Sequence, residues 1–272
     1  MSQSLNFQPL IRITNYKISA FAKAYTKPIP TMKKILFLLI ALSITQNYAQ
    51  TTLKPDAVFD GETLHKDWVV VVRDSIIAYV GVSTDKTDRH FTIPLEGMTL
   101  MPGLIEGHSH LLLHPYNETT WNDQVLKESH TERAIRGVVH AENSLLAGVT
   151  TMRDLGSEGA GYSDVYLKKT IDQGIIPGPR LLVAGPAIVA TGAYGPKGFH
   201  EGVTVPLGAE SASGTTEVIK AVRRQLGNGA DFIKIYADYR WRAGETSQPT
   251  FLQEELDIMI AAAETAGRYA VA

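Results

Sequence analysis

From Pro102 onward the sequence alternates between short apolar runs rich in β-branched residues and longer stretches with the apolar spacing of helices. Strands connected through helices lie parallel in one sheet with right-handed crossovers, so this alternation restricts the chain to an α/β fold. Four strand–helix units and the start of a fifth correspond to half of an eight-stranded barrel. We therefore interpret residues 101–272 as the first half of a (β/α)8 TIM barrel.

The boundaries of these elements follow from apolar periodicity and from Gly and Pro positions. Thr250 and Gln253 have the spacing of a capping box, and Gly267 is the residue type that ends helices. The first predicted strand begins at Leu104, and four further strands are predicted at 149–154, 180–184, 231–236 and 268–272. The predicted helices cover 131–146, 163–173, 215–226 and 250–267.

Residues 51–100 have a different pattern of short strands without intervening helices. Two β-branched runs flank Arg73, Asp74 and Ser75, which is typical of a hairpin. Further strands are expected at 92–95 and 98–100. A stretch of this size is too small for an independent sandwich, so we interpret it as part of a small β-sandwich domain.

The N-terminal region is basic, and its first acidic residue is Asp56. Residues 32–50 begin with Met32 and two lysines, continue with an apolar run and end near Ala49, which is the pattern of a secretory signal peptide. The apolar run is shorter than a membrane span, so we expect a secreted or periplasmic protein with no stable membrane anchor. Residues 1–31 are then an upstream extension. An organellar transit peptide is the alternative interpretation.

Charge and cysteine content exclude several functions. Six of the 26 Lys and Arg residues precede residue 50, while all 28 Asp and Glu residues follow it, so the remaining chain has a net charge of −8. Such an acidic protein is not expected to bind nucleic acid. With no cysteine, any metal must be held by His, by carboxylates or by a less usual ligand.

His108 and His110 are the first candidate metal ligands. Alternate residues of a strand point to one face, so both imidazoles project together and Ser109 faces the other way. Two imidazoles on one strand face can share a metal such as zinc. The simpler alternative is a pair of solvated loop histidines.

Lys234 is the second candidate, because it shares a strand face with Phe232 and Tyr236. If Ile233 and Ile235 pack against outer helices, Lys234 points into the barrel, where an unpaired ammonium tends to lose its proton. A neutral amine can react with CO2 to give a carbamate, which is an anionic oxygen ligand. The simpler alternative is a lysine whose amine reaches solvent at the strand end.

These segments resemble the amidohydrolase superfamily. Met101-Pro-Gly-Leu-Ile-Glu-Gly-His-Ser-His110 resembles the entry into barrel strand one, and residues 229–235 resemble strand four of the imidazolonepropionase-like and Xaa-Pro dipeptidase-like branch. Residues 148–156 resemble strand two, and residues 178–186 with 191–194 resemble strand three and its loop. The resemblance covers nearly all of residues 55–272.

The resemblance implies one or two divalent ions, most simply zinc, held by His108 and His110 and bridged by carboxylated Lys234. It also implies two further histidines on strands five and six and a general-base Asp on strand eight, all expected beyond Ala272. The chain is therefore expected to be an N-terminal portion without a catalytic residue of its own.

Four further residues are candidates for binding substrate. His114 follows the histidine pair, and His200 lies in a Gly-rich loop. Tyr194 and Tyr236 could donate hydrogen bonds to a developing oxyanion. In the family, the loop of Tyr194 more often has the sequence Thr-Gly-Gly-His. Surface or packing roles are the alternatives for all four.

The leading hypothesis is an exported amidohydrolase that hydrolyses a small-molecule amide or a dipeptide with a metal-activated water. The alternative is a catalytically inactive metal- or ligand-binding half-barrel that pairs with another chain. A deacetylase acting on acyl-amino sugars fits less well after strand two. Oligomerisation is compatible with any of these.

Overall fold

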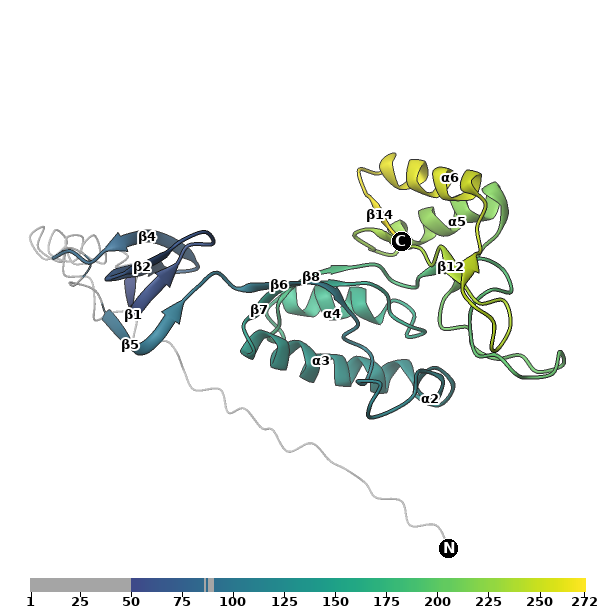
Figure 1. Ribbon diagram of the computed structural model, residues 1–272, viewed down its shortest axis with the longest axis horizontal. Coiled ribbons are helices and arrows are strands. Elements are labelled where there is room, and N and C mark those ends of the chain that lie inside the picture. The colour runs from purple at the N-terminus through teal and green to yellow at the C-terminus, as the bar shows by residue number, and fades with distance from the viewer. Residues whose placement is uncertain (1–49, 86, 88–90) are drawn as a thin grey trace, which may run out of the picture. The chain divides into compact units, whose positions relative to one another are not determined.

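The computed structural model describes residues 50–85, 87 and 91–272 (Figure 1). The predicted signal peptide and upstream extension lie outside these residues. The chain divides into two compact units, residues 1–100 and 101–272, which we describe separately. Within the described residues, no helix has both the length and the apolar character needed to cross a membrane.

The first unit contains one five-stranded sheet in the order β2-β1-β3-β4, with β5 paired in parallel to β1. Antiparallel β3 and β4 form the predicted hairpin, and Asp74 in its turn has φ 54°. The two strands expected after residue 91 are one strand, because β1 pairs along its length through a bulge. The sandwich itself stays a prediction. The strands are β1 (Gln50–Phe59), β2 (Leu64–Lys66), β3 (Trp68–Arg73), β4 (Ile76–Val82) and β5 (Phe91–Leu100).

The second unit begins with a parallel sheet in the order β6-β7-β8. Helices α3 and α4 pack on it, and their shared core includes Ala141, Leu167, Leu181 and Val183 (Figure 1). Helix α2 was not predicted; Thr120 accepts a hydrogen bond from the amide of Asp123 at its start. The elements are β6 (Leu104–Ser109), α2 (Trp121–Lys127), α3 (His130–Leu146), β7 (Val149–Asp154), α4 (Ser163–Asp172) and β8 (Arg180–Val183).

The rest of the unit packs around α5 and α6, which lie side by side (Figure 1). Their core is built on Val218, Val222, Ile233 and Met259. The elements are β9 (Ile188–Val189), β10 (Glu210–Ser211), α5 (Gly214–Gly227), β11 (Ile233–Lys234), β12 (Asp238–Tyr239), β13 (Gln248–Pro249), α6 (Gln253–Glu264) and β14 (Ala270–Val271).

Parallel pairing continues from one half of this unit to the other. Strands β11 and β14 are parallel, and the amide of Asp231 donates to the carbonyl of Val183 at 2.8 Å, which brings β11 beside β8. The sheets β6-β7-β8 and β11-β14 are separate, and this backbone hydrogen bond connects them. Barrel closure would need further strands and stays a prediction.

Two predicted boundaries were wrong. Only Ile233 and Lys234 of the strand predicted at 231–236 are paired in the ladder with β14. Helix α6 starts at Gln253, and the Glu255 carboxylate accepts from the amide of Leu252 at 2.8 Å. Thr250 does not cap this helix, because its hydroxyl donates to carbonyls of the preceding strand region.

Candidate metal and substrate site

The histidine pair lies at the carboxyl end of β6. The rings of His108 and His110 face each other edge-on with centroids 5.4 Å apart. The Ser109 hydroxyl donates to the carbonyl of Arg153 at 3.1 Å, on the neighbouring strand β7. The two imidazoles are therefore brought together as the alternation of strand side chains predicted.

Both histidines have the features of metal ligands. Nδ1 of His110 lies 3.0 Å from the carbonyl oxygen of Gly156. When Nδ1 carries the proton and donates it to this carbonyl, Nε2 is free to bind a ligand. Burial lowers the pKa of His108, and the charges of His110 and Lys234 lower it further. A neutral imidazole is the form that binds metal.

Lys234 lies at the end of β11 and is only 4% exposed. Burial lowers the pKa of its amine; the nearby charge of Glu158 raises it, and that of Arg153 lowers it. The ammonium makes no ion pair with any residue that the structure describes. Its amine lies 5.2 Å from the centroid of the Tyr236 ring. The Lys234 side chain is therefore largely buried, and its amine makes a ring contact with Tyr236 but no ion pair among the described residues.

Glu158 is the residue that sequence reasoning missed. It follows β7 in a Gly-rich loop and is 3% exposed. Its carboxylate accepts from the indole of Trp121 at 2.6 Å, from the phenol of Tyr194 at 3.0 Å and from the phenol of Tyr236. Nδ1 of His110 lies 4.0 Å from the same carboxylate. The available signal was its place just beyond a strand's carboxyl end, where barrel enzymes keep functional residues.

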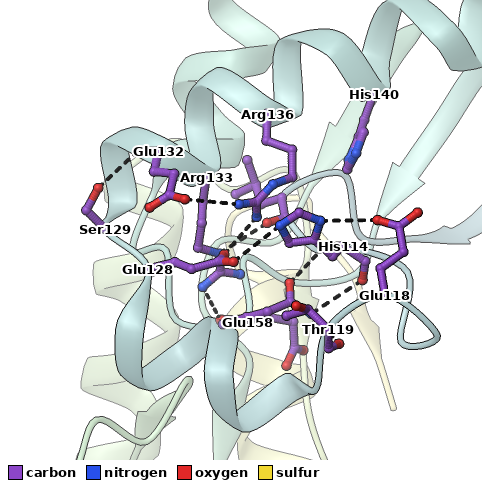
Figure 2. Close-up of polar contacts among 12 residues, drawn as sticks. His114, Glu118, Thr119, Glu128, Ser129, Glu132, Arg133, Arg136, His140 and Glu158 are labelled. Carbon is purple, nitrogen blue, oxygen red and sulfur yellow. Dashed lines mark hydrogen bonds and ion pairs between the residues drawn. The ribbon is translucent and has the colours of Figure 1, made fainter.

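The backbone of Glu158 adopts the left-handed conformation, with φ 49°. For a residue with a side chain this costs on the order of 1–3 kcal/mol unless the surroundings hold it. The surroundings here include Arg133, whose guanidinium donates to the carbonyls of Ser157 and Glu158 at 3.0 and 2.7 Å (Figure 2). Arg133 of α3 therefore holds the backbone of this loop.

Tyr194 and Tyr236 come together in the structure, as two of the predicted substrate-binding residues. Their rings stack with centroids 4.9 Å apart. The Tyr239 ring is tilted against that of Tyr194, with centroids 4.8 Å apart. Burial and the charge of Glu158 raise the pKa of both phenols. Both side chains therefore stay protonated at neutral pH and act as hydrogen-bond donors.

The other two predicted substrate-binding residues lie apart from this cluster. His114 is held between the carboxylates of Glu118 and Glu128 at 3.4 and 3.2 Å, and Glu128 also pairs with Arg136 at 2.8 Å (Figure 2). His114 lines a groove of about 440 Å³ that also includes His110. His200 is exposed and accepts from the amide of Gly202, so its predicted role gains no support.

The donor set is compatible with a metal but incomplete. In the part of the chain that the structure describes, no group of three His, Cys, Asp or Glu side chains could hold an ion. Two imidazoles and the buried amine of Lys234 are the available donors, and a carbamate on that amine would add an oxygen donor. The residues thus fit part of a metal site.

Parallel strands joined by helices, with polar residues at their carboxyl ends, define an α/β protein of the kind that barrel enzymes represent. The amidohydrolase family model matches residues 99–272, and the chain belongs to this family. Ochratoxinase from Aspergillus niger is 32% identical over 228 residues, an alignment that covers 74% of this chain and 45% of that protein.

Solved structures give the same grouping. A Xaa-Pro dipeptidase with bound methionine is 27% identical to this chain, with a TM-score of 0.67. The superposition covers 81% of this chain and 55% of the dipeptidase chain. A prolidase complexed with N-methylphosphonate-L-proline is 25% identical with a TM-score of 0.69 and the same coverage. The chain spans about half the length of these relatives.

Proposed function

We propose that this chain is the N-terminal portion of an exported, metal-dependent amidohydrolase that hydrolyses C–N bonds of small amides or dipeptides. The observation that carries the proposal is the placement of His108 and His110 at the carboxyl end of β6 and of Lys234 at the end of β11. Lys234 is a largely buried lysine without an ion pair among the described residues, and its charge acts on His108; such an amine is a suitable precursor of a carbamate ligand. Family membership and the dipeptidase relatives support the reaction class.

His108 and His110 would hold a divalent ion, for which zinc suits the imidazole donors. Lys234 would add an oxygen ligand after its amine forms an N–C bond to CO2 and releases a proton. When bound, such an ion polarises a carbonyl and lowers the pKa of a bound water. The remaining ligands and the general base would come from the part of the relatives' length that this chain does not cover.

The chain's own residues orient this site. The carbonyl of Gly156 holds Nδ1 of His110, which leaves Nε2 of this ring available as a ligand atom. The stacked rings of Tyr194 and Tyr236 form an aromatic wall against which an apolar part of a small substrate would pack. Lys234 lies next to that wall. Substrate and metal would therefore meet at the carboxyl ends of β6 and β11.

Hydrolysis of a panel of Xaa-Pro dipeptides, other dipeptides and N-acyl amino acids tests the proposal, in the zinc-loaded natural protein that contains this chain. The His108→Asn/His110→Asn double variant should lose at least about 1,000-fold in kcat/KM, because both proposed ligands are gone. The control His65→Asn lies in the first unit and should retain activity. Unchanged hydrolysis by the double variant would refute the proposal, and hydrolysis of no substrate by the wild type would favour a ligand-binding half-barrel.

A further inference from the structure

A single buried carboxylate connects three aromatic side chains of the site. Trp121 comes from α2, Tyr194 from the loop after β9 and Tyr236 from the chain after β11, and all three donate to Glu158. These donors lie 37, 36 and 78 residues from Glu158 in the sequence. Local structure therefore cannot account for their meeting, and the carboxylate is the atom group they share.

The carboxylate itself has little freedom to move. Glu158 is 3% exposed, and its backbone carbonyl accepts a hydrogen bond from the guanidinium of Arg133. Arg133 is 1% exposed and also donates to the carbonyls of Leu112 and Ser157 (Figure 2). A chain of contacts thus runs from α3 through Arg133 and the Glu158 backbone to the phenols. Arg133 and Glu158 are buried and the two tyrosines are half-buried, so these contacts lie in a closely packed region that restricts their movement.

The phenols lie beside the proposed metal ligands. The Tyr236 ring lies 5.2 Å from the amine of Lys234, and the Glu158 carboxylate lies 4.0 Å from Nδ1 of His110. Both carboxylate oxygens are already occupied by the aromatic donors, Oε2 by Trp121 and Tyr194 and Oε1 by Tyr236. Three of the roughly four acceptor positions of the carboxylate are therefore used by aromatic donors, and these contacts suit orientation of the three rings.

We propose that Glu158 is a positioning residue that fixes Tyr194 and Tyr236 against the His108, His110 and Lys234 side of the site. The catalytic part of this inference rests on the proposed amidohydrolase function, whereas the ordering of the two tyrosine segments does not. Misplacement of a substrate-positioning group by about 1 Å can lower a rate by about 100-fold, so the effect should be measurable.

The test compares Glu158→Ala, Glu158→Gln and Glu255→Gln in the natural protein that contains this chain. Glu255 is the matched control, because it is also a buried glutamate that accepts two hydrogen bonds, from Leu252 and Gly214, and contacts neither tyrosine. Hydrogen–deuterium exchange of segments 192–198 and 236–242 measures the order of the tyrosine segments. Steady-state hydrolysis of a dipeptide measures kcat and KM separately.

We expect exchange in both segments to rise at least about tenfold in Glu158→Ala, and less in Glu158→Gln, which retains one oxygen acceptor. Glu255→Gln should leave both segments unchanged. The kcat/KM should fall about 100-fold in Glu158→Ala and about tenfold in Glu158→Gln, at zinc contents equal to that of the wild type.

Two results would overturn the inference. Unchanged exchange in both segments would show that Glu158 does not hold the tyrosines. Equal losses of kcat/KM in Glu158→Gln and Glu255→Gln would show a general effect on stability. If the wild type hydrolyses nothing, the proposed function fails, and the exchange measurement still decides whether Glu158 orders the tyrosines.

Discussion

At the level of single residues, the second unit contains two buried carboxyl side chains, Asp154 at the end of β7 and Asp164 in α4. Asp154 is fully buried and accepts from the amides of Leu111 and Gly156, and Asp164 accepts from the amide of Gly185 at 2.7 Å. These carboxylates connect backbone segments that follow different strands. Burial raises the pKa of both, and the charge of Asp164 raises that of Asp154 further. Removing Asp164 should therefore change how stability depends on pH.

Burial raises the pKa of Asp164 from 3.8 to about 6. The folded state then binds more protons than the unfolded state between these values, so this residue's contribution becomes less favourable as pH rises and is constant above about pH 6. From pH 4 to 7, the free energy of unfolding of Asp164→Asn should increase relative to that of the wild type by on the order of 2 kcal/mol. Urea unfolding at each pH measures this difference.

The exposed Asp172 provides the control for this experiment. Asp172→Asn should stay within about 0.5 kcal/mol of the wild type at every pH. Parallel pH curves for Asp164→Asn and the wild type would contradict the assignment of Asp164 as a carboxyl with a raised pKa.

What the sequence reveals at this scale depends on how local the signal is. Strand alternation predicts that His108 and His110 share one face, and it predicts an inward direction for Lys234 if Ile233 and Ile235 pack outward. Their selection as metal ligands rested on the family resemblance and stays a prediction. Glu158 could not be predicted, because its role depends on donors from three distant segments. The placement of His200 in a substrate site rested on loop composition, and the structure leaves it exposed with a local hydrogen bond.

At the element scale, the alternation of strands and helices was predictable because apolar periodicity reflects which faces are buried. The element ends were less predictable. Helix α2 has only seven residues and too few turns to show a periodic pattern, so it was missed. The extent of β11 depends on where β8, β9 and β14 offer partners, which the sequence of one strand does not encode.

The start of α6 gives a prediction at this scale. The Glu255 carboxylate accepts from the amide of Leu252 at the start of α6 and from the amide of Gly214 at the start of α5, at 2.8 and 2.6 Å. Glu255→Ala would leave both amides without this partner, so the free energy of unfolding should fall by about 2 kcal/mol. Urea unfolding measures the loss. The neighbouring exposed Glu254→Ala should change stability by less than about 0.5 kcal/mol, and equal effects of the two substitutions would argue against this double cap.

At the level of the whole molecule, the chain matches about half the length of its relatives. His108, His110 and Lys234 are proposed as metal ligands, and within the described residues they have no third His, Cys, Asp or Glu beside them that could complete a site. The family and the parallel order of the strands were predictable from motifs that lie within single strands. Barrel closure was expected from the same motifs and stays a prediction, because the described strands of the second unit pair only in small separate sheets.

Export is a prediction about the whole protein. If residues 32–50 act as a signal peptide, cleavage after Ala49 would leave Gln50 as the first residue of the secreted form. N-terminal sequencing of the protein recovered from the extracellular or periplasmic fraction of its source measures this directly. A mature protein that still begins before Met32, or that occurs only inside the cell, would contradict export.

We propose that His108, His110 and Lys234 form part of a metal site. The most direct measurement is the zinc content of the natural protein that contains this chain, after metal removal and dialysis against zinc with bicarbonate. The wild type should hold at least about one zinc ion per chain, and Lys234→Met should hold less. The His108→Asn/His110→Asn variant should lose the zinc, while His65→Asn should keep it. Equal zinc in the wild type and the double variant would contradict the account.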